Sequence, residues 1–185
     1  MEKLKIAVIA GTSRPGRLSI RAARFVFSVV QQHAEIDAIW VDVDELQFEK
    51  DGNNEELKNP QYSAITKDAD GFFIVTPEYN HSYPGSLKRM LDSEYGNYKH
   101  KPVAMAGVSD GQWGGIRCLQ NLLPVLRKLG LVTLVQDVQF PKVQEIFNES
   151  GELQDPAYTK RVERVLDELI WMAKVLKAGR DQTAV

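Results

Sequence analysis

Short runs of apolar residues recur along the chain and scarcely alternate with polar ones. Runs of this length are typical of β-strands buried on both faces, as in a parallel sheet covered by helices. Four such strands are predicted at residues 6–10, 71–76, 103–108 and 131–136. A fifth is predicted at residues 38–43, where apolar and polar positions mix as expected nearer the edge of a sheet.

The segments between these runs have apolar residues three or four positions apart, which is the spacing of one helix face. Residues 20–30 and 116–126 show it, and a last helix is predicted from about Pro156 to Lys177. The regular strand–helix alternation predicts an α/β fold with a doubly wound, five-stranded parallel sheet and helices on both faces. Such folds bind ligands beyond the carboxyl ends of the strands.

One domain accounts for the whole pattern. A chain of 185 residues with 43% hydrophobic content suits one globular core, predicted to span residues 1–178. Residues 47–60 and 140–156 are polar and irregular, yet too short to link domains. Residues 179–185 are predicted to be a frayed tail.

The charge balance and the cysteine content limit the kinds of partner and compartment to be expected. The 23 basic and 25 acidic residues give a net charge of −2, so we expect a small-molecule partner, no nucleic acid and no membrane. Cys118 is the only cysteine, which rules out an internal disulfide and suits packing in a reducing compartment. The first residues contain too few apolar side chains to form a signal peptide, so a cytoplasmic location is expected.

The first candidate site follows the first strand, at residues 11–19, directly before a helix. Backbone N–H groups at a helix start are unpaired and attract anions, and Thr12, Ser13 and Ser19 add hydroxyls. Arg17 and Leu18 stand where a Walker A loop needs Lys and Ser or Thr, which argues against a nucleoside triphosphatase. The Gly-x-Gly-x-x-Gly fingerprint is absent too.

A hydroxyl-rich loop of this kind suits a terminal phosphate monoester, such as that of FMN. The alternative is an ordinary turn followed by a helix that Ser19 caps.

Two further polar loops follow the third and fourth strands. In residues 77–88, two prolines and a glycine fix the backbone, which could lie rigidly against a flat ring. Residues 109–115 are glycine-rich and could approach a ring edge closely, or could form only a flexible connection. All three loops are expected at one edge of the sheet.

Together the three loops resemble the NADPH-dependent FMN reductase family, which includes azoreductase, quinone reductase and chromate reductase types. The similarity covers nearly the whole chain, and the run Pro-Glu-Tyr-Asn-x-Ser-x-Pro-Gly-x-Leu-Lys at residues 77–88 is its most specific part. The resemblance implies a flavodoxin-like fold and the cofactor FMN. By the same resemblance Ser13, Arg14 and Ser19 hold the phosphate, Pro77, Glu78, Tyr79 and Asn80 line the isoalloxazine, and Ser109, Gly111, Gly114 and Gly115 close its other side.

Such an enzyme needs no catalytic side chain, because FMN carries the redox chemistry between NADPH (or NADH) and a small acceptor. Ping-pong kinetics are expected, since donor and acceptor would use one place in turn. His81 is a candidate proton donor, and Arg14 and Arg17 are candidates for a 2′-phosphate contact. The family implies a homodimer or homotetramer, to whose surface Leu91 could contribute.

Two alternatives stay open at this point. A flavodoxin-like electron carrier would share the fold, although such carriers tend to have an acidic docking surface. A flavin redox sensor with little turnover would share the motifs. The acceptor, whether a flavin, quinone, azo compound or metal oxyanion, is not specified by these residues.

Overall fold

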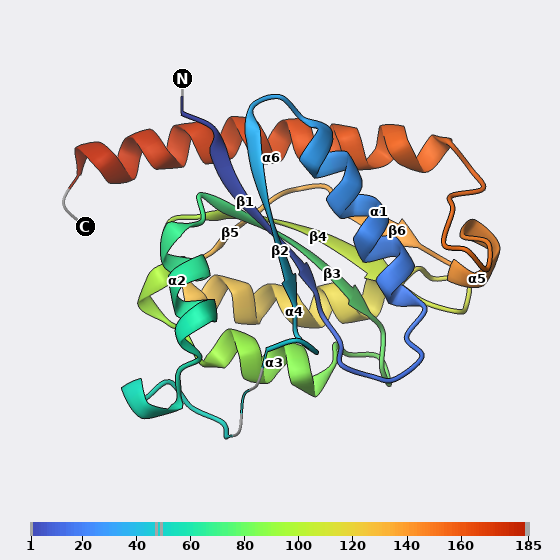
Figure 1. The fold of residues 1–185 in the computed structure, drawn as a ribbon, viewed down its shortest axis with the longest axis horizontal. Coiled ribbons are helices and arrows are strands. Elements are labelled where there is room, and N and C mark those ends of the chain that lie inside the picture. Colours follow the sequence, from blue (N-terminus) through green and yellow to red (C-terminus); the bar gives the residue numbers. More distant parts are fainter. Residues whose placement is uncertain (1, 47, 49, 184–185) are drawn as a thin grey trace.

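Six parallel strands form one sheet in the computed structural model, which describes residues 2–46, 48 and 50–183 (Figure 1). The strand order is β2-β1-β3-β4-β5, and β6 also pairs with β4. This order, with its reversal at β1 and β3, is that of the flavodoxin-like doubly wound fold. The strands are β1 (Leu4–Ala10), β2 (Ile36–Asp42), β3 (Gly71–Pro77), β4 (Pro102–Val108), β5 (Val132–Thr133) and β6 (Val138–Phe140).

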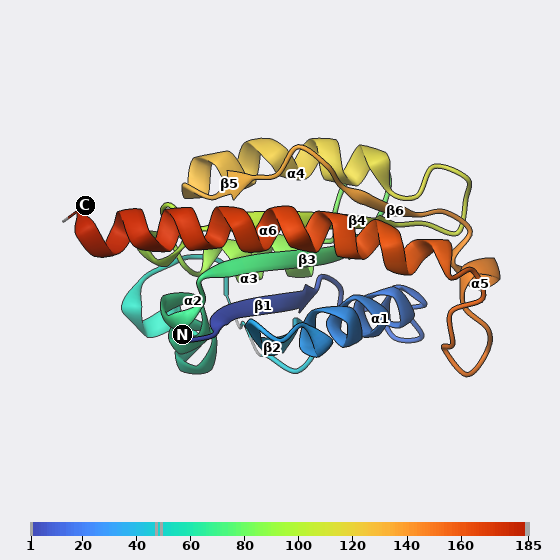
Figure 2. The ribbon, with the colours of Figure 1, turned by 90° about the horizontal axis from the view of Figure 1, so that it is seen from above.

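Helices cover both faces of the sheet, as the strand–helix alternation predicts (Figures 1 and 2). α1 and α6 pack on one face, and α2, α3 and α4 on the other. The α-helices are α1 (Ser19–Gln32), α2 (Pro60–Asp68), α3 (Gly85–Asp92), α4 (Ile116–Leu129), α5 (Val143–Ile146) and α6 (Ala157–Gln182), and the 3₁₀ turns are η1 (Glu55–Leu57) and η2 (Gly96–Tyr98).

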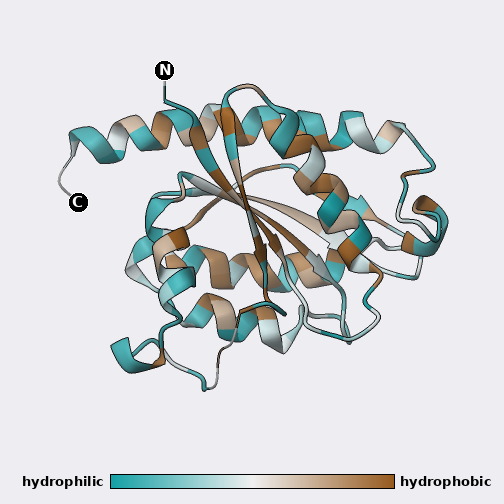
Figure 3. Ribbon diagram, viewed as in Figure 1, coloured by the Kyte–Doolittle hydropathy of each residue, from teal (hydrophilic) through white to brown (hydrophobic). Residues whose placement is uncertain are grey.

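Along each central strand, successive side chains point to opposite faces of the sheet and pack against different helix layers. In β1, Ile6 and Val8 belong to the core under α1 and α6, whereas Ala7 and Ile9 belong to the core over α2, α3 and α4. Because both faces are covered, the strands are apolar almost throughout, and Figure 3 shows the hydrophobic residues gathered in them. Leu91 is fully buried in the second core, so this residue packs in the core and is not available to a subunit surface.

The predicted fifth strand at residues 131–136 is two short strands in the structure. β5 pairs with the start of β4, as Val132 lies opposite Pro102, and β6 pairs with its end, as Val138 lies opposite Ala106. Between them the chain leaves the sheet, and Val135 is 89% exposed. The prediction of five strands therefore missed that the strand beside β4 is interrupted and forms two short strands.

The last helix also differs from its predicted bounds. α6 continues to Gln182, whereas an end near residue 177 and a frayed tail from residue 179 were expected. Arg180 anchors the extra turn, because its guanidinium donates to the His100 carbonyl at 2.6 Å and pairs with Asp70 at 3.4 Å. Residues 184–185 of the predicted tail lie outside the described residues.

Both segments predicted to be irregular contain local structure. Residues 50–60 include η1 and lead to α2, where the Asn59 side chain accepts a hydrogen bond from the Tyr62 N–H at 3.0 Å; residues 47 and 49 lie outside the described part. Residues 140–156 contain α5 and a β-bridge between Phe147 and Leu153. Among the described residues, no helix is long and apolar enough to cross a membrane.

Candidate functional site

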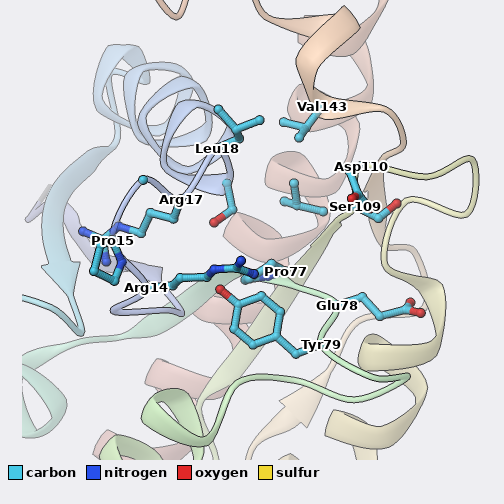
Figure 4. A pocket seen from close by; sticks show the side chains of 13 residues that line it. Arg14, Pro15, Arg17, Leu18, Pro77, Glu78, Tyr79, Ser109, Asp110 and Val143 are labelled. Atoms are coloured by element: carbon cyan, nitrogen blue, oxygen red, sulfur yellow. The ribbon is translucent and has the colours of Figure 1, made fainter.

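A pocket of about 300 Å³ opens where β1, β3 and β4 end (Figure 4). The three loops singled out in the sequence meet there, which is the edge at which doubly wound sheets bind ligands. The residues that line it are Arg14, Pro15, Gly16, Arg17, Leu18, Ser19, Pro77, Glu78, Tyr79, Val108, Ser109, Asp110 and Val143.

The N-terminus of α1 forms one wall of the pocket. Gly16, with a φ of +70°, turns the loop, and α1 then begins at Ser19 after Leu18, whose apolar side chain cannot cap the helix. The first turn also contains no acidic residue. The unpaired N–H groups and the positive end of the helix dipole therefore favour an anion.

Ser19 adds a hydroxyl to this wall. The residue is only 7% exposed and lines the pocket, and its hydroxyl has no hydrogen-bond partner among the described residues. Ser19 is the first helical residue and not the N-cap, so the alternative of a helix capped by Ser19 is wrong. Because the hydroxyl faces the open pocket, solvent can reach it, and it is available to an oxyanion bound there.

The two arginines of the first loop have different roles. Arg17 pairs with Asp42 at 2.7 Å and Asp44 at 3.4 Å, and it also donates to the Thr12 carbonyl, so its guanidinium ties the loop to the end of β2. Arg14 has no carboxylate partner in the described part of the chain, and its guanidinium lies 5.7 Å from the Tyr79 ring centre. Of the two, Arg14 is the one free to bind an anion.

The second loop is a rigid turn tied to the first. Tyr79 and Ser82 exchange backbone hydrogen bonds of 2.8 and 2.9 Å around a turn in which Asn80 and His81 have left-handed conformations. The Tyr79 hydroxyl shares a 2.9 Å hydrogen bond with the Thr12 hydroxyl of the first loop. Tyr79 therefore holds its ring at the pocket, while Asn80 and His81 are exposed outside the lining.

Glu78 lines the pocket but directs its carboxylate toward α4 (Figure 4). The carboxylate accepts a hydrogen bond from the Arg117 N–H at 3.2 Å and pairs with the Arg117 guanidinium at 3.6 Å. The Glu78 N–H donates to the Val108 carbonyl at 2.9 Å. These contacts fix the second loop against the third.

The third loop contributes its first residues to the pocket and its last ones to packing. Ser109 and Asp110 line the pocket, and the Ser109 carbonyl accepts a 3.0 Å hydrogen bond from the N–H of Val143. Gly114 and Gly115 have φ values of +58° and +78°. A Cβ on Gly115 would lie 2.6 Å from the Val108 nitrogen, so close packing on β4 explains this glycine.

The pocket thus brings together six of the eleven predicted site residues: Arg14, Ser19, Pro77, Glu78, Tyr79 and Ser109. The other five lie in the same loops but outside the lining: Ser13, Asn80, Gly111, Gly114 and Gly115. Trp113 is also outside it and is 57% exposed. Which of these residues contact FMN stays a prediction.

Sequence reasoning missed Val143 in the lining. It stands in a segment predicted to be irregular, and it reaches the pocket because the Lys142 N–H bonds to the Gly111 carbonyl at 2.9 Å. That contact depends on the path after β6, for which the sequence carries no local signal.

No side chain in the pocket forms a nucleophile–base pair. Cys118 is buried, and burial raises the pKa of its thiol to about 12, so it stays protonated and serves packing as predicted. What the pocket offers is an anion wall at α1 beside the flat surfaces of Pro77 and Tyr79. These features fit FMN, which has a phosphate at one end and a planar ring at the other; ligand pockets have volumes of about 300–1,000 Å³, so the ring would be partly exposed.

The chain is similar to known flavin reductases. The family model described as NADPH-dependent FMN reductase matches residues 4–145. A quinone reductase of Escherichia coli (strain K12) is 33% identical over 132 residues, which are 68% of this chain and 70% of the relative. An NADPH azoreductase of Bacillus sp. (strain OY1-2) is 32% identical over 188 residues, covering 98% of this chain and 99% of the relative.

Solved structures of flavoenzymes share the fold. The NAD(P)H:(acceptor) oxidoreductase FerB of Paracoccus denitrificans superposes with a TM-score of 0.73 at 23% identity, covering 92% of this chain and 98% of that one. The apo form of an NADH:FMN oxidoreductase superposes with a TM-score of 0.69 at 22% identity, covering 90% of this chain and 88% of that one. With the family match over most of the chain, these findings show that the chain belongs to the NADPH-dependent FMN reductase family and is an NAD(P)H-dependent oxidoreductase that uses FMN.

Proposed function

We propose that the pocket at the ends of β1, β3 and β4 is the FMN site, and that the enzyme uses it to reduce a small quinone. The observation that carries this proposal is Ser19, whose hydroxyl lines the pocket at the uncapped start of α1 and has no protein partner among the described residues. A phosphate monoester there would accept hydrogen bonds from the hydroxyl and from the first N–H groups of α1. Arg14 would neutralise its second charge.

The other loops orient the ring. Pro77 and Tyr79 offer flat surfaces, and the hydrogen bond between Tyr79 and Thr12 keeps the phenol ring in one position. FMN supplies hydride and electron transfer when it is bound. The protein positions the reactants and excludes part of the solvent, because three loops enclose the pocket.

Donor and acceptor are proposed to enter the same pocket in turn. The described residues form one sheet with its covering helices, and they include no second nucleotide-binding fold beside it. NADPH would bind first and leave as NADP⁺ before the acceptor enters. Ping-pong kinetics follow from this order, with parallel double-reciprocal lines.

The similarity to a quinone reductase and to an NADPH azoreductase supports a planar, electron-poor acceptor. We place quinones first because another relative, from Burkholderia sp., is a 2-hydroxy-1,4-benzoquinone reductase that is 32% identical over 154 residues. An azo compound is the second candidate.

The test begins with the visible absorption spectrum of the purified protein. FMN added to the protein should bind at one site per chain, and anaerobic NADPH should bleach its absorption. Rates with benzoquinone at several fixed NADPH concentrations should give parallel lines. Intersecting lines, with product inhibition controlled, would contradict a pocket shared by donor and acceptor. If NADPH oxidation required an added partner reductase, the alternative of a flavodoxin-like electron carrier would be favoured.

We further propose that the enzyme is a cytoplasmic homodimer or homotetramer that acts on small molecules and not on nucleic acid or membranes. The nearly balanced charge and the buried free cysteine support this proposal. Trp113 and Ile116, exposed at the start of α4, are apolar surface that a second subunit could cover. Light scattering during size-exclusion chromatography measures the mass, and a monomer at micromolar concentration contradicts the oligomer.

A further inference from the structure

A second hollow, of about 460 Å³, lies at the opposite edge of the sheet from the FMN pocket. It is enclosed by the end of α2, the segment that leads into β4 and the end of α6. Five of its lining side chains are basic: Lys67, Lys99, His100, Lys101 and Arg180. Four of them are lysine or arginine, which is a dense cluster for a chain with a net charge of −2.

Two of these cations are held in place by the fold. The Lys101 ammonium group donates to the carbonyls of Thr66 and Lys67 at 2.7 and 2.9 Å, and the residue is 7% exposed. The Arg180 guanidinium donates to the His100 carbonyl at 2.6 Å. Because these groups are already ordered, a ligand that binds them loses less conformational entropy than it would on free side chains.

The positive charge of the hollow is only partly compensated. Asp70 is buried and pairs with Arg180 at 3.4 Å, but it also pairs with Lys177 at 3.0 Å. Within the described residues, Lys67, Lys99 and Lys101 have no carboxylate within 4.0 Å. Cations that line a hollow strengthen the local potential and attract anions, even where some of them, such as Lys67 and Lys99, are exposed.

The backbone fixes how the basic residues enter the hollow. His100 has a left-handed conformation with a φ of +58°, and its N–H donates to the Gly130 carbonyl at 3.0 Å. Gly130 in turn leaves room for Lys99, because a Cβ there would approach the Lys99 side chain to 3.2 Å. The Lys99–Lys101 segment is therefore held from both sides.

We propose that this hollow is an anion site for a small oxyanion of the phosphate class that carries two or more negative charges. Arginine and lysine suit such a ligand, since the guanidinium fork and the ammonium group both donate to phosphate oxygens. The site is not an extension of the FMN pocket. Lys101 precedes β4 and Ser109 follows it, and a strand of seven residues is about 23 Å long.

Inorganic pyrophosphate is the probe for this site. Isothermal titration of the FMN-saturated protein, in a buffer without phosphate, should show one saturable site per chain. The double variant Lys67→Ala/Lys99→Ala should weaken binding at least tenfold. A control that removes two exposed lysines elsewhere, Lys128→Ala/Lys160→Ala, should bind as the wild type does.

Three results would overturn the inference. One is the absence of saturable binding, and another is equal weakening in the control, which would indicate only a general charge effect. The third is weakening by Arg14→Ala without an effect of Lys67→Ala/Lys99→Ala, which would assign the anion to the FMN pocket. Since this readout requires no turnover, its failure is distinct from failure of the proposed reductase activity.

Discussion

Ser19 places a hydroxyl in the pocket wall, and this hydroxyl has no protein partner among the described residues. It lies at the start of α1, where the helix dipole already favours an anion. In the apoprotein water can satisfy the hydroxyl, and a phosphate would replace that water with a charge-assisted hydrogen bond. An accessible hydroxyl beside unpaired helix N–H groups is typical of an anion-binding site.

Ser19→Ala should therefore weaken FMN binding without destabilising the apoprotein. Loss of one charge-assisted hydrogen bond corresponds to about 1.5 kcal/mol, or roughly a tenfold rise in the FMN dissociation constant. Quenching of flavin fluorescence measures that constant, and urea denaturation measures the stability. Ser28→Ala is the matched control, since the Ser28 hydroxyl donates to the Phe25 carbonyl on the same helix, away from the pocket.

An unchanged FMN constant in Ser19→Ala, or an equal rise in Ser28→Ala, would remove the Ser19 hydroxyl from the phosphate site. Destabilisation of the apoprotein by Ser19→Ala would instead show that the hydroxyl has a structural partner.

Replacing Arg14 should weaken FMN binding, whereas replacing Arg17 should lower the stability of the protein. Arg17→Ala leaves the Asp42 carboxylate, which is 2% exposed, without its closest cation, so the free energy of unfolding should fall by about 2 kcal/mol or more. Arg14→Ala removes no ion pair and should change stability by less than about 0.5 kcal/mol, while raising the FMN constant. Urea denaturation of both apoproteins makes the comparison, and similar losses in the two variants would contradict the assigned roles.

The sequence placed Ser19 in a candidate phosphate loop because such loops have local rules: a strand, a turn with glycine and hydroxyls, then a helix. Arg14 was added to that candidate site by the family resemblance. The sequence left the role of Arg17 open because that role depends on a distant residue. Asp42 is 25 positions away along the chain, and only the parallel register that sets Ala10 opposite Asp42 brings it to the loop. Long-range pairs of this kind have no signature within either segment.

At the scale of elements, the turn between β4 and α4 depends on glycine. Gly107, Gly114 and Gly115 pack backbone against backbone, and a Cβ on Gly107 would lie 2.5 Å from the Gly114 carbonyl oxygen. The sequence predicted a glycine-rich site loop here, but close packing and positive φ explain two of these glycines without any ligand contact.

Gly115→Ala should destabilise the protein by more than about 2 kcal/mol, because the new Cβ meets the Val108 backbone at a positive φ. Gly179→Ala is the matched control. It has open space in the last turn of α6, and alanine there should leave the stability unchanged or raise it by up to about 1 kcal/mol. Thermal unfolding followed by circular dichroism compares the two, and a stable Gly115→Ala protein would show that this close contact can relax.

The predicted strands show where periodicity is sufficient and where it fails. The positions of β1, β3 and β4 follow from continuous apolar runs, since a strand buried on both faces must be apolar throughout. Residues 131–136 form a similar run, yet only Val132 and Thr133 pair as β5. The run cannot show that the chain leaves the sheet at Val135, because this depends on which half of β4 each segment meets.

For the molecule as a whole, each end of the parallel strands has its own proposed anion site. Loops meet at the carboxyl edge to form the FMN pocket, whose position follows from the strand order and was predicted. At the other edge, Lys101 links three elements: its ammonium group caps the end of α2, it precedes β4, and it lies in the hollow that Arg180 of α6 lines. No pattern near Lys101 in the sequence indicated this.

Lys101 should make the stability of the whole protein depend on pH in the alkaline range. Burial, together with the charge of Arg180, lowers the pKa of Lys101 from 10.5 to about 8. Between about pH 8 and pH 10.5 the unfolded chain binds a proton at this group that the folded protein has lost, so this contribution to the free energy of unfolding rises with pH. The slope amounts to at most about 1.4 kcal/mol per pH unit for one proton.

Urea denaturation of the wild type and of Lys101→Met across this pH range isolates the effect, because other groups titrate alike in both proteins. The wild-type curve should rise relative to that of Lys101→Met between pH 8 and 10.5, and the two should run parallel below pH 7. Lys160→Met, which removes an exposed lysine from α6, should follow the wild type. Parallel curves for Lys101→Met over the whole range would mean that the buried ammonium group is stabilised in its charged form, as it would be if an anion remained bound beside it.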